Sequence, residues 1–394
     1  MPDIEKGIYA FNGMKLSRAD IEWLLATHEN GLGPVDWSID GQRSREGIDL
    51  RGADLRQIDL SGLPLACMIG GLNMMQNQAI NSDHRKKAAV ALDGANLRQS
   101  HLEGAILYNA SVRGVALQGA FLQNAKARWA GMEGSRMRGA HLEGADLRSA
   151  HLEGNTLADA CLDGTDLRSA FFDAASTLTT LGSKENTALV FEVRWGGVDL
   201  AHVDWSQVNT LGDERIAKKQ AKKDLQLEGL HQAVRAYRKL AVELQGQGLN
   251  EEAAHFAYRA QVLQKSVRRF QILQPEMRRR QRLQALGAWL FSWFLFLLAG
   301  YGYKPVRCFF AYLIVITGFA LSYYLLGLSD AGLHHLAWNE AFVVSMAAFH
   351  GRGFFADQFH PGDPQAFVAA FEALIGLLIE ITLIATLTRR LFGQ

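Results

Sequence analysis

Two acidic residues lie inside the last long apolar segment of the chain, residues 367 to 387. Glu372 and Glu380 are the acidic residues of this segment. An ionisable side chain at membrane depth costs at least about 2.5 to 3.5 kcal/mol, so it is expected to face a cavity or a partner. Several copies of Glu380 around an aqueous path would favour cations. Alternatively, Glu380 is protonated or paired between helices and has a structural role.

A short apolar segment and a glycine-containing loop precede this helix. Residues 338 to 349 are too few to cross a bilayer, which takes about 20 residues. Non-helical backbone at membrane depth is tolerated where it lines a water-filled path or is buried in protein, so the following loop predicts a pore. Apolar residues 306 to 327 complete the order helix, pore loop, helix. The predicted loop comprises Phe349, His350, Gly351, Arg352, Gly353 and Phe354.

This order resembles the two-helix pore domain of potassium channels. The sequence Gly351-Arg352-Gly353 stands where that family has Gly-Tyr-Gly, and Gly376 lies near the position of its hinge glycine. The resemblance covers roughly residues 306 to 390, about a fifth of the chain. It implies a homotetramer, because one chain supplies too few helices to enclose a path and closed symmetry is required. The threonine, tyrosine and aspartate of the family's filter are absent, so potassium selectivity is not implied.

Two residues of the predicted pore have alternative roles. Arg352 replaces a tyrosine that points away from the pore in the resembled family, so we expect it to reach behind the loop and pair with Glu372. If Arg352 instead faced the axis, like charges would repel cations and favour anions. His350 either titrates near neutral pH and gates the loop, or is simply hydrogen-bonded within it, which we favour.

A five-residue repeat occupies much of the N-terminal half. From Leu97 to Phe172, the central position recurs every five residues, and each centre is Leu, Val, Met or Phe except for Ala127. The pattern resembles the pentapeptide-repeat family, whose fold is a right-handed square β-helix with four repeats per coil. In that fold the large centre and the small residue two positions before it point inward.

The outward positions of this predicted β-helix offer two further hypotheses. His101, Phe121, His141 and Cys161 form one column, but the two histidines would lie roughly 10 Å apart with a phenylalanine between them, so solvated surface is favoured over a metal site. Mimicry of DNA, known in relatives that inhibit topoisomerases, needs a strongly acidic face. Residues 93 to 175 carry 10 acidic and 8 basic residues, so we do not favour it or any nucleic-acid partner.

A basic region precedes the apolar segments. Residues 213 to 284 contain 16 Lys or Arg and 8 Asp or Glu. Helical periodicity in residues 225 to 244 and 253 to 273, broken by glycines, predicts an antiparallel hairpin. It could bind a partner helix, but a spacer that also makes subunit contacts is favoured.

The 13-residue apolar run from Ala285 to Leu297 is expected to lie on the membrane surface rather than to span the membrane. Its basic and aromatic residues would contact anionic lipid, at about 1 kcal/mol per charge near the surface. The expected lipid contacts are Arg278, Arg279, Arg280, Arg282, Trp289 and Trp293. Arg307 and Arg389-Arg390 then share the cytoplasmic side, which places both termini in the cytoplasm.

Together these features predict a multi-domain β and α membrane protein. The whole chain resembles bacterial pentapeptide-repeat proteins with an ion-channel domain, which implies an inner-membrane channel. A partner or ligand of the cytoplasmic β-helix would regulate it. The expected parts are an N-terminal cap (1–47), a β-helix (48–210) with insertions at about 63–91 and 176–197, a basic helical hairpin (211–284), an interfacial helix and turn (285–303), and a transmembrane domain (304–394).

Other observations limit the classes of function. The cysteines Cys67, Cys161 and Cys308 are scattered and odd in number, which favours a reduced cytoplasmic setting. The first thirty residues lack the continuous apolar core of a signal peptide. The sequence shows no nucleophile elbow, phosphate loop or spaced zinc ligands, so we expect neither an enzyme nor a cofactor or metal. A non-conducting membrane scaffold and a DNA-mimicking regulator are the alternatives.

Overall fold

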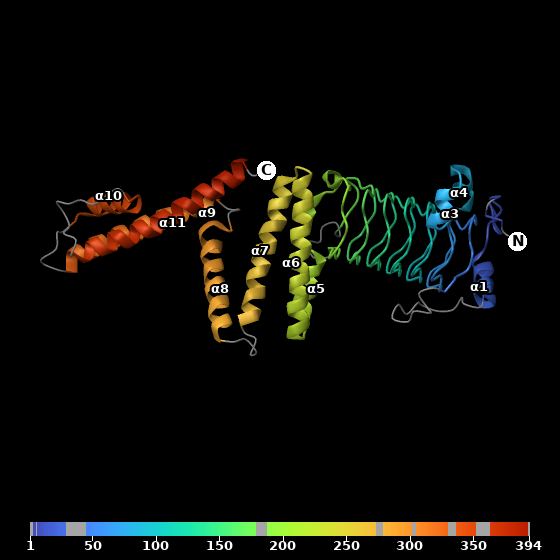
Figure 1. Ribbon diagram of the computed structural model, residues 1–394, viewed down its shortest axis with the longest axis horizontal. Coiled ribbons are helices and arrows are strands. Elements are labelled where there is room, and N and C mark those ends of the chain that lie inside the picture. Colours follow the sequence, from blue (N-terminus) through green and yellow to red (C-terminus); the bar gives the residue numbers. More distant parts are fainter. Residues whose placement is uncertain are drawn as a thin grey trace. The chain divides into compact units, whose positions relative to one another are not determined.

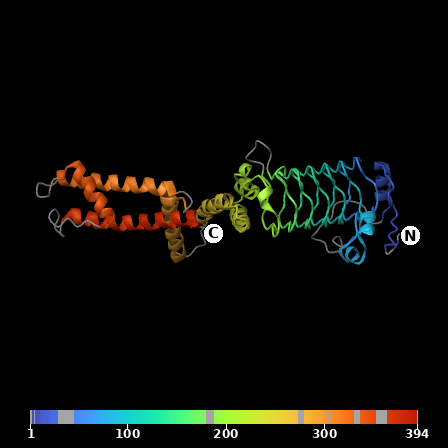
Figure 2. The same cartoon turned by 90° about the horizontal axis from the view of Figure 1, so that it is seen from above.

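The computed structural model describes residues 3–4, 6–28, 45–178, 187–272, 279–301, 305–329, 336–351 and 363–392 (Figures 1 and 2). It divides into two compact units, Met1–Ala260 and Gln261–Gln394, and each is described by itself.

A β-helix forms most of the first unit. Parallel single-residue bridges connect positions twenty apart, as in His101↔Phe121 and Phe121↔His141, and four such ladders run along the coils. Extended strands are absent from the residues that the structure describes, because each repeat contributes one bridge and then turns. The large centre and the small residue before it both point inward: Leu142 and Ala140 are fully buried. The β-helix part of the predicted fold is therefore confirmed.

The corners of the coils require a left-handed backbone. Gly144 has a φ of +69°, which glycine adopts without a steric penalty, but Ser149 occupies the next corner with a φ of +55°. Non-glycine residues at such corners carry a cost that the surrounding ladder hydrogen bonds must outweigh.

The first interruption of the β-helix is shorter than the predicted 63–91. Bridges Pro64↔His101 and Ile69↔Ile106 show that the ladder continues through these residues. The sequence pattern hides this coil because large and small residues exchange places: Met68 fills the usual small position, and Gly70 takes the centre, where an added Cβ would lie 2.7 Å from a methyl group of Val90. The inserted residues then form α3 (Met74–Ala79) and α4 (Ser82–Ala88).

The end of the β-helix also differs from expectation. Bridges Cys161↔Leu189 and Asp166↔Arg194 place residues 187 to 194 in a regular coil, so the second insertion is narrower than the predicted 176–197. After this coil, within the predicted β-helix range of 48–210, the chain forms two 3-10 helices, η1 (Leu200–His202) and η2 (Trp205–Gln207). The side chains of Asp199 and Asp204 cap these helices, which favours the tight turns.

The N-terminal residues cover the first coil. Helix α1 (Arg18–Thr27) begins with a capping box formed by Ser17 and Asp20, and it buries Ile21 and Leu25. Just before it, Lys15 forms a parallel bridge to Asp54, which adds a rung to the ladder. This rung and the helix protect the edge that an open β-helix would expose.

Three helices cover the other end of the β-helix: α5 (Gly212–Lys219), α6 (Lys223–Gly246) and the first part of α7 (Asn250–Ile272). The Gln247 amide accepts from the Leu200 N–H at 2.7 Å and donates to the Val198 carbonyl at 2.6 Å. Inside the helical layer, the buried Glu214 carboxylate accepts hydrogen bonds from Lys218, Tyr237 and Arg259. Burial raises the pKa of Glu214, but these partners outweigh it and lower the pKa.

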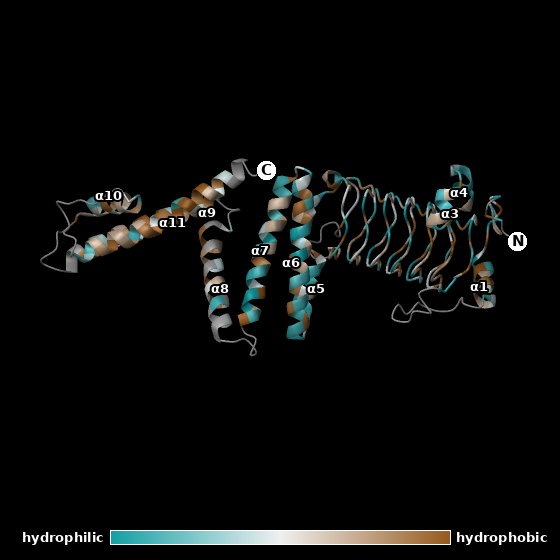
Figure 3. Cartoon of the chain, viewed as in Figure 1, coloured by the Kyte–Doolittle hydropathy of each residue, from teal (hydrophilic) through white to brown (hydrophobic). Residues whose placement is uncertain are grey.

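The second unit contains α8 (Arg279–Ala299), α9 (Pro305–Ser329), α10 (Trp338–Phe349) and α11 (Pro364–Phe392). Helix α10 packs against both α9 and α11. The expected apolar run at residues 285 to 297 lies within the single 21-residue helix α8. Figure 3 shows hydrophobic residues along much of α11.

Two helices of this unit are long and apolar enough to cross a membrane by length and composition, over Val306–Leu326 and Pro364–Thr388. In the most apolar window of each, only 17% of the residues are buried within the chain. The core helix of a soluble domain would be mostly buried. These two apolar surfaces therefore need lipid or further protein to cover them.

Candidate functional site

A groove lies where the C-terminal end of α10 meets the middle of α11. Its volume is about 390 Å³. It brings together predicted residues of the loop and of the last helix that are about thirty positions apart in the sequence. The lining residues are Phe349, His350, Gly351, Ala370, Ala373, Leu374, Leu377 and Glu380.

Gly376 allows α10 to approach α11 this closely. A Cβ added to Gly376 would overlap the carbonyl group of Phe349, the last residue of α10. The Phe349 side chain is buried and its ring meets the Tyr312 ring edge-on at 4.8 Å. Sequence reasoning placed a hinge glycine here, and the structure gives this glycine a steric role: it seats the end of the short helix.

His350 and Glu380 form a pair that the sequence did not predict. His350 Nε2 lies 3.5 Å from Glu380 Oε1, and each side chain is about one-third exposed. His350 Nδ1 lies 2.8 Å from the Met346 carbonyl oxygen. Because a carbonyl only accepts, Nδ1 carries hydrogen, and Nε2 attracts the carboxylate only when it is protonated too. His350 is thus hydrogen-bonded within the turn, and both its role and the orientation of Glu380 toward a pore stay predictions.

Glu372 is fully buried and receives two hydroxyl groups. Tyr323 OH from α9 donates to Glu372 Oε2 at 2.8 Å, and Ser345 Oγ from α10 lies 2.5 Å from Oε1. This carboxyl group therefore joins all three helices. Sequence reasoning missed Tyr323 and Ser345, although hydroxyl groups within apolar helices are a signal that such a partner exists.

Ser345 contacts two possible acceptors but has only one hydroxyl hydrogen, which favours a protonated Glu372. Ser345 Oγ lies 2.9 Å from the Ile316 carbonyl oxygen as well as close to the Glu372 carboxyl group. A serine hydroxyl has one hydrogen to donate. If that hydrogen goes to Ile316, the short contact to Glu372 is satisfied by a proton on the carboxyl group.

Several predicted residues lie outside the described part of the chain. Arg352, Gly353 and Phe354 are among them, so the expected Arg352 pairing with Glu372 stays a prediction. Gly351 ends α10 with a φ of +63°, and its N–H donates to the Ala348 carbonyl at 2.9 Å.

The expected lipid-contact residues are described in part. Arg278 and the side chains of Arg279, Arg280 and Arg282 lie outside the described set. Trp293 packs beside Trp289, and Lys265 of α7 places its ammonium group 4.1 Å from the Trp293 ring centre and 3.8 Å from that of Phe296. Burial lowers the pKa of Lys265. This cation–π contact holds the end of α7 against α8.

The histidine and cysteine column of the β-helix is a stack of rings. The Phe121 ring lies between those of His101 and His141, with centroid separations of 4.7 and 4.9 Å. Each histidine also contacts the glutamate two positions on, Glu103 or Glu143. Within the described residues, no group of three or more His, Cys, Asp or Glu side chains is placed to hold a metal ion.

Comparison with known proteins identifies the repeats. Residues 89–126 and 132–173 match the family model for pentapeptide repeats, in eight copies. No curated protein matches the chain.

Solved structures similar to this chain include pentapeptide-repeat proteins of two cyanobacteria. Rfr23 from Cyanothece 51142 is 25% identical over 33% of this chain and 87% of its own, with a TM-score of 0.23. HetL from Nostoc sp. strain PCC 7120, which its title links to regulation of heterocyst differentiation, is 17% identical over 50% of this chain and 98% of its own, with a TM-score of 0.20. Both TM-scores are below 0.5, so nothing about function follows.

Proposed function

We propose that this chain, which carries pentapeptide repeats, forms an oligomeric ion channel in the bacterial inner membrane. In this proposal α9 and α11 span the membrane, and the end of α10 and the following loop line the ion path. The β-helix and both termini are cytoplasmic. The pentapeptide-repeat domain supports a regulatory or protein-interaction role for the cytoplasmic part.

The seating of α10 between two apolar helices is the observation that carries the proposal. A twelve-residue helix too short to span is held against α11 by Gly376 and is joined to both neighbours through Glu372. Its C-terminal end, where helix dipoles are negative, lies beside His350 and Glu380. The negative end of the α10 dipole and the Glu380 carboxylate would both favour cations over anions.

The exposed apolar surfaces support an oligomer. Two spanning helices cannot enclose a path, and most of the apolar windows of α9 and α11 are not buried within one chain. Copies of the chain around an axis would cover part of this surface, and lipid would cover the rest. Four copies are the number implied by the resemblance to potassium channels.

Charge pairing on the β-helix argues against the DNA-mimic alternative. Asp146 and Asp166 are stacked on one face, and each carboxylate is paired with the arginine two positions on, Arg148 or Arg168. An acidic column neutralised in this way does not present the continuous negative charge of a duplex.

Ion flux from liposomes tests the proposal. The full-length protein would be reconstituted and flux measured under separate potassium, sodium and chloride gradients, with empty liposomes as the control. We expect cation flux that exceeds chloride flux. Chloride flux would place Arg352 on the axis, whereas absence of flux in every gradient would favour the non-conducting scaffold.

A further inference from the structure

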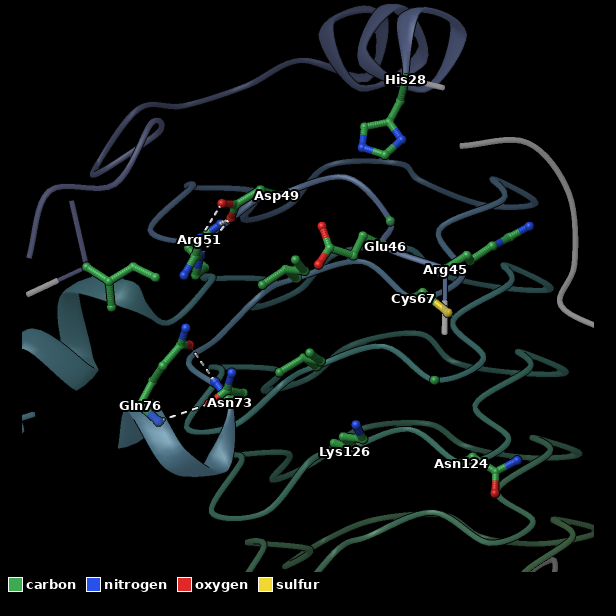
Figure 4. Close-up of a pocket in the computed structure, with 15 residues that line it drawn as sticks. His28, Arg45, Glu46, Asp49, Arg51, Cys67, Asn73, Gln76, Asn124 and Lys126 are labelled. Carbon is green, nitrogen blue, oxygen red and sulfur yellow. Dashed lines mark hydrogen bonds and ion pairs between the residues drawn. The ribbon is translucent and has the colours of Figure 1, made fainter. Parts of the chain in front are cut away.

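A second, larger pocket lies on the side of the β-helix near its N-terminal end (Figure 4). Its volume is about 730 Å³, within the range of small-molecule sites. It forms where the repeats are interrupted: α3 flanks the floor on one side, and the end of α1 contributes His28. A regular pentapeptide coil has flat faces, so the departures from regularity create this hollow.

The floor of the pocket is apolar and ends in a lysine. Ile69, Ile106 and Lys126 occupy consecutive rungs of one ladder. The adjacent corner at Gly104 carries no side chain, which leaves the floor open. The Lys126 side chain is exposed, and its ammonium group forms no hydrogen bond or ion pair with the part of the chain that the structure describes.

Hydrogen-bond donors dominate the wall formed by α3. Asn73 and Gln76 use their side-chain carbonyl oxygens in a reciprocal capping box. Their amide NH₂ groups have no partner among the described residues and belong to side chains that line the pocket. The wall therefore offers donors rather than acceptors to a ligand.

The charges around the pocket are also mainly positive. Asp49 is neutralised by a two-point contact with Arg51, and the other charged residues of the lining are Arg45, Glu46 and Lys126. Burial raises the pKa of the Cys67 thiol, the charges of Arg45 and Lys126 oppose this shift, and that of Glu103 adds to it. Arg45, Cys67 and Lys126 all line the pocket.

We propose that this pocket binds a phosphate-bearing small molecule of nucleotide size. Lys126 and the amide donors would hold the phosphate, and the floor of Ile69 and Ile106 would pack against a flat apolar ring. This binding goes beyond the proposed ion channel, because it stands or fails whether or not the chain conducts ions.

Isothermal titration calorimetry on the full-length protein in detergent tests the proposal. The probes are adenosine monophosphate, inorganic phosphate and adenosine, which shares the ring but lacks the charge. We expect the nucleotide to bind at least tenfold more tightly than adenosine. Lys126→Gln should weaken nucleotide binding by about tenfold or more, since a charge-assisted hydrogen bond is lost. Lys126→Arg should retain most of the affinity, and Lys86→Gln on exposed α4 should match wild type.

Three results would overturn the assignment. One is the absence of saturable binding of both nucleotide and phosphate at millimolar concentration. Another is equal affinity for adenosine and its monophosphate, because the phosphate would then contribute nothing. The third is unchanged nucleotide affinity in Lys126→Gln, which would place any binding elsewhere on the protein.

Discussion

At the scale of single residues, Gly376 and the buried carboxyl group of Glu372 hold α10 in place. Gly376 permits α10 to approach α11, and Glu372 joins the three helices through Ser345 and Tyr323. Neither residue contacts water freely. Both roles are therefore tested by stability as well as by ion flux.

Gly376→Ala should destabilise the second unit. The added methyl group overlaps the Phe349 carbonyl, and overpacking of this kind typically costs about 1 to 3 kcal/mol. Gly318→Ala in α9 is the matched control, because nothing lies within 4 Å of its added Cβ and alanine favours a helix. Thermal unfolding in detergent should show a lower midpoint for the first variant alone. Equal midpoints would contradict the steric role.

Glu372→Gln should be tolerated far better than Glu372→Ala. A glutamine amide can still accept from Tyr323 and donate to Ser345, as a protonated carboxyl group does. Alanine removes the hydrogen bond of Tyr323 to the carboxyl group and leaves Ser345 only its contact with the Ile316 carbonyl, and the loss of a buried hydrogen-bond partner costs about 1 to 3 kcal/mol. Thermal unfolding of both variants measures this difference. If glutamine is as damaging as alanine, Glu372 must be ionised or hold a partner outside the described residues.

At the scale of elements, the left-handed corners of the coils and buried carboxyl groups affect the stability of the β-helix. Ser149→Gly should stabilise the β-helix by up to about 1 kcal/mol, because glycine adopts the observed φ of +55° without a steric penalty. Ser149→Ala keeps the Cβ and should give no gain. Amide hydrogen exchange of the flanking coils measures the effect, and equal protection in both variants would contradict it.

Asp163 should make the β-helix less stable as pH rises. Burial and the nearby negative charges of Asp213 and Glu143 raise the pKa of Asp163 to about 7. The folded state thus holds this proton to a higher pH than the unfolded chain, where the pKa is about 4. The stabilising contribution is complete below about pH 4 and is lost as pH rises through about 7.

Asp163→Asn should remove part of this pH dependence. Hydrogen exchange of the last coils, corrected for intrinsic rates, would be compared across pH 5 to 8 in wild type and in the variant. Asp83→Asn on exposed α4 is the control. A wild-type slope identical to that of Asp163→Asn would show that Asp163 ionises normally.

The sequence predicted the regular coils, but it failed where a large and a small residue exchange their usual positions. Spacing alone located Leu142 and Ala140 in the core, because every such repeat places the same two positions inward. It missed the coil around Met68 and Gly70, where the large residue stands at the small position. The sequence placed both His350 and Glu380 at the predicted pore, but it did not predict that they are in contact. That contact depends on how closely Gly376 lets α10 and α11 pack.

At the scale of the whole molecule, the chain combines pentapeptide repeats with two apolar helices that are mostly exposed within the chain. Gln247, at the C-terminal end of α6, fixes this helix to residues 198 to 200, Glu214 joins α5 to α6, and Lys265 joins α7 to α8.

The most direct test of the channel proposal is potassium and sodium flux from liposomes that contain either wild type or Glu380→Gln. Glu251→Gln, on the exposed first turn of α7, is the matched control. We predict that cation flux falls at least severalfold in Glu380→Gln and is unchanged in Glu251→Gln, because Glu380 lies beside the end of α10. Cation flux that is equal in all three proteins would contradict a path along Glu380.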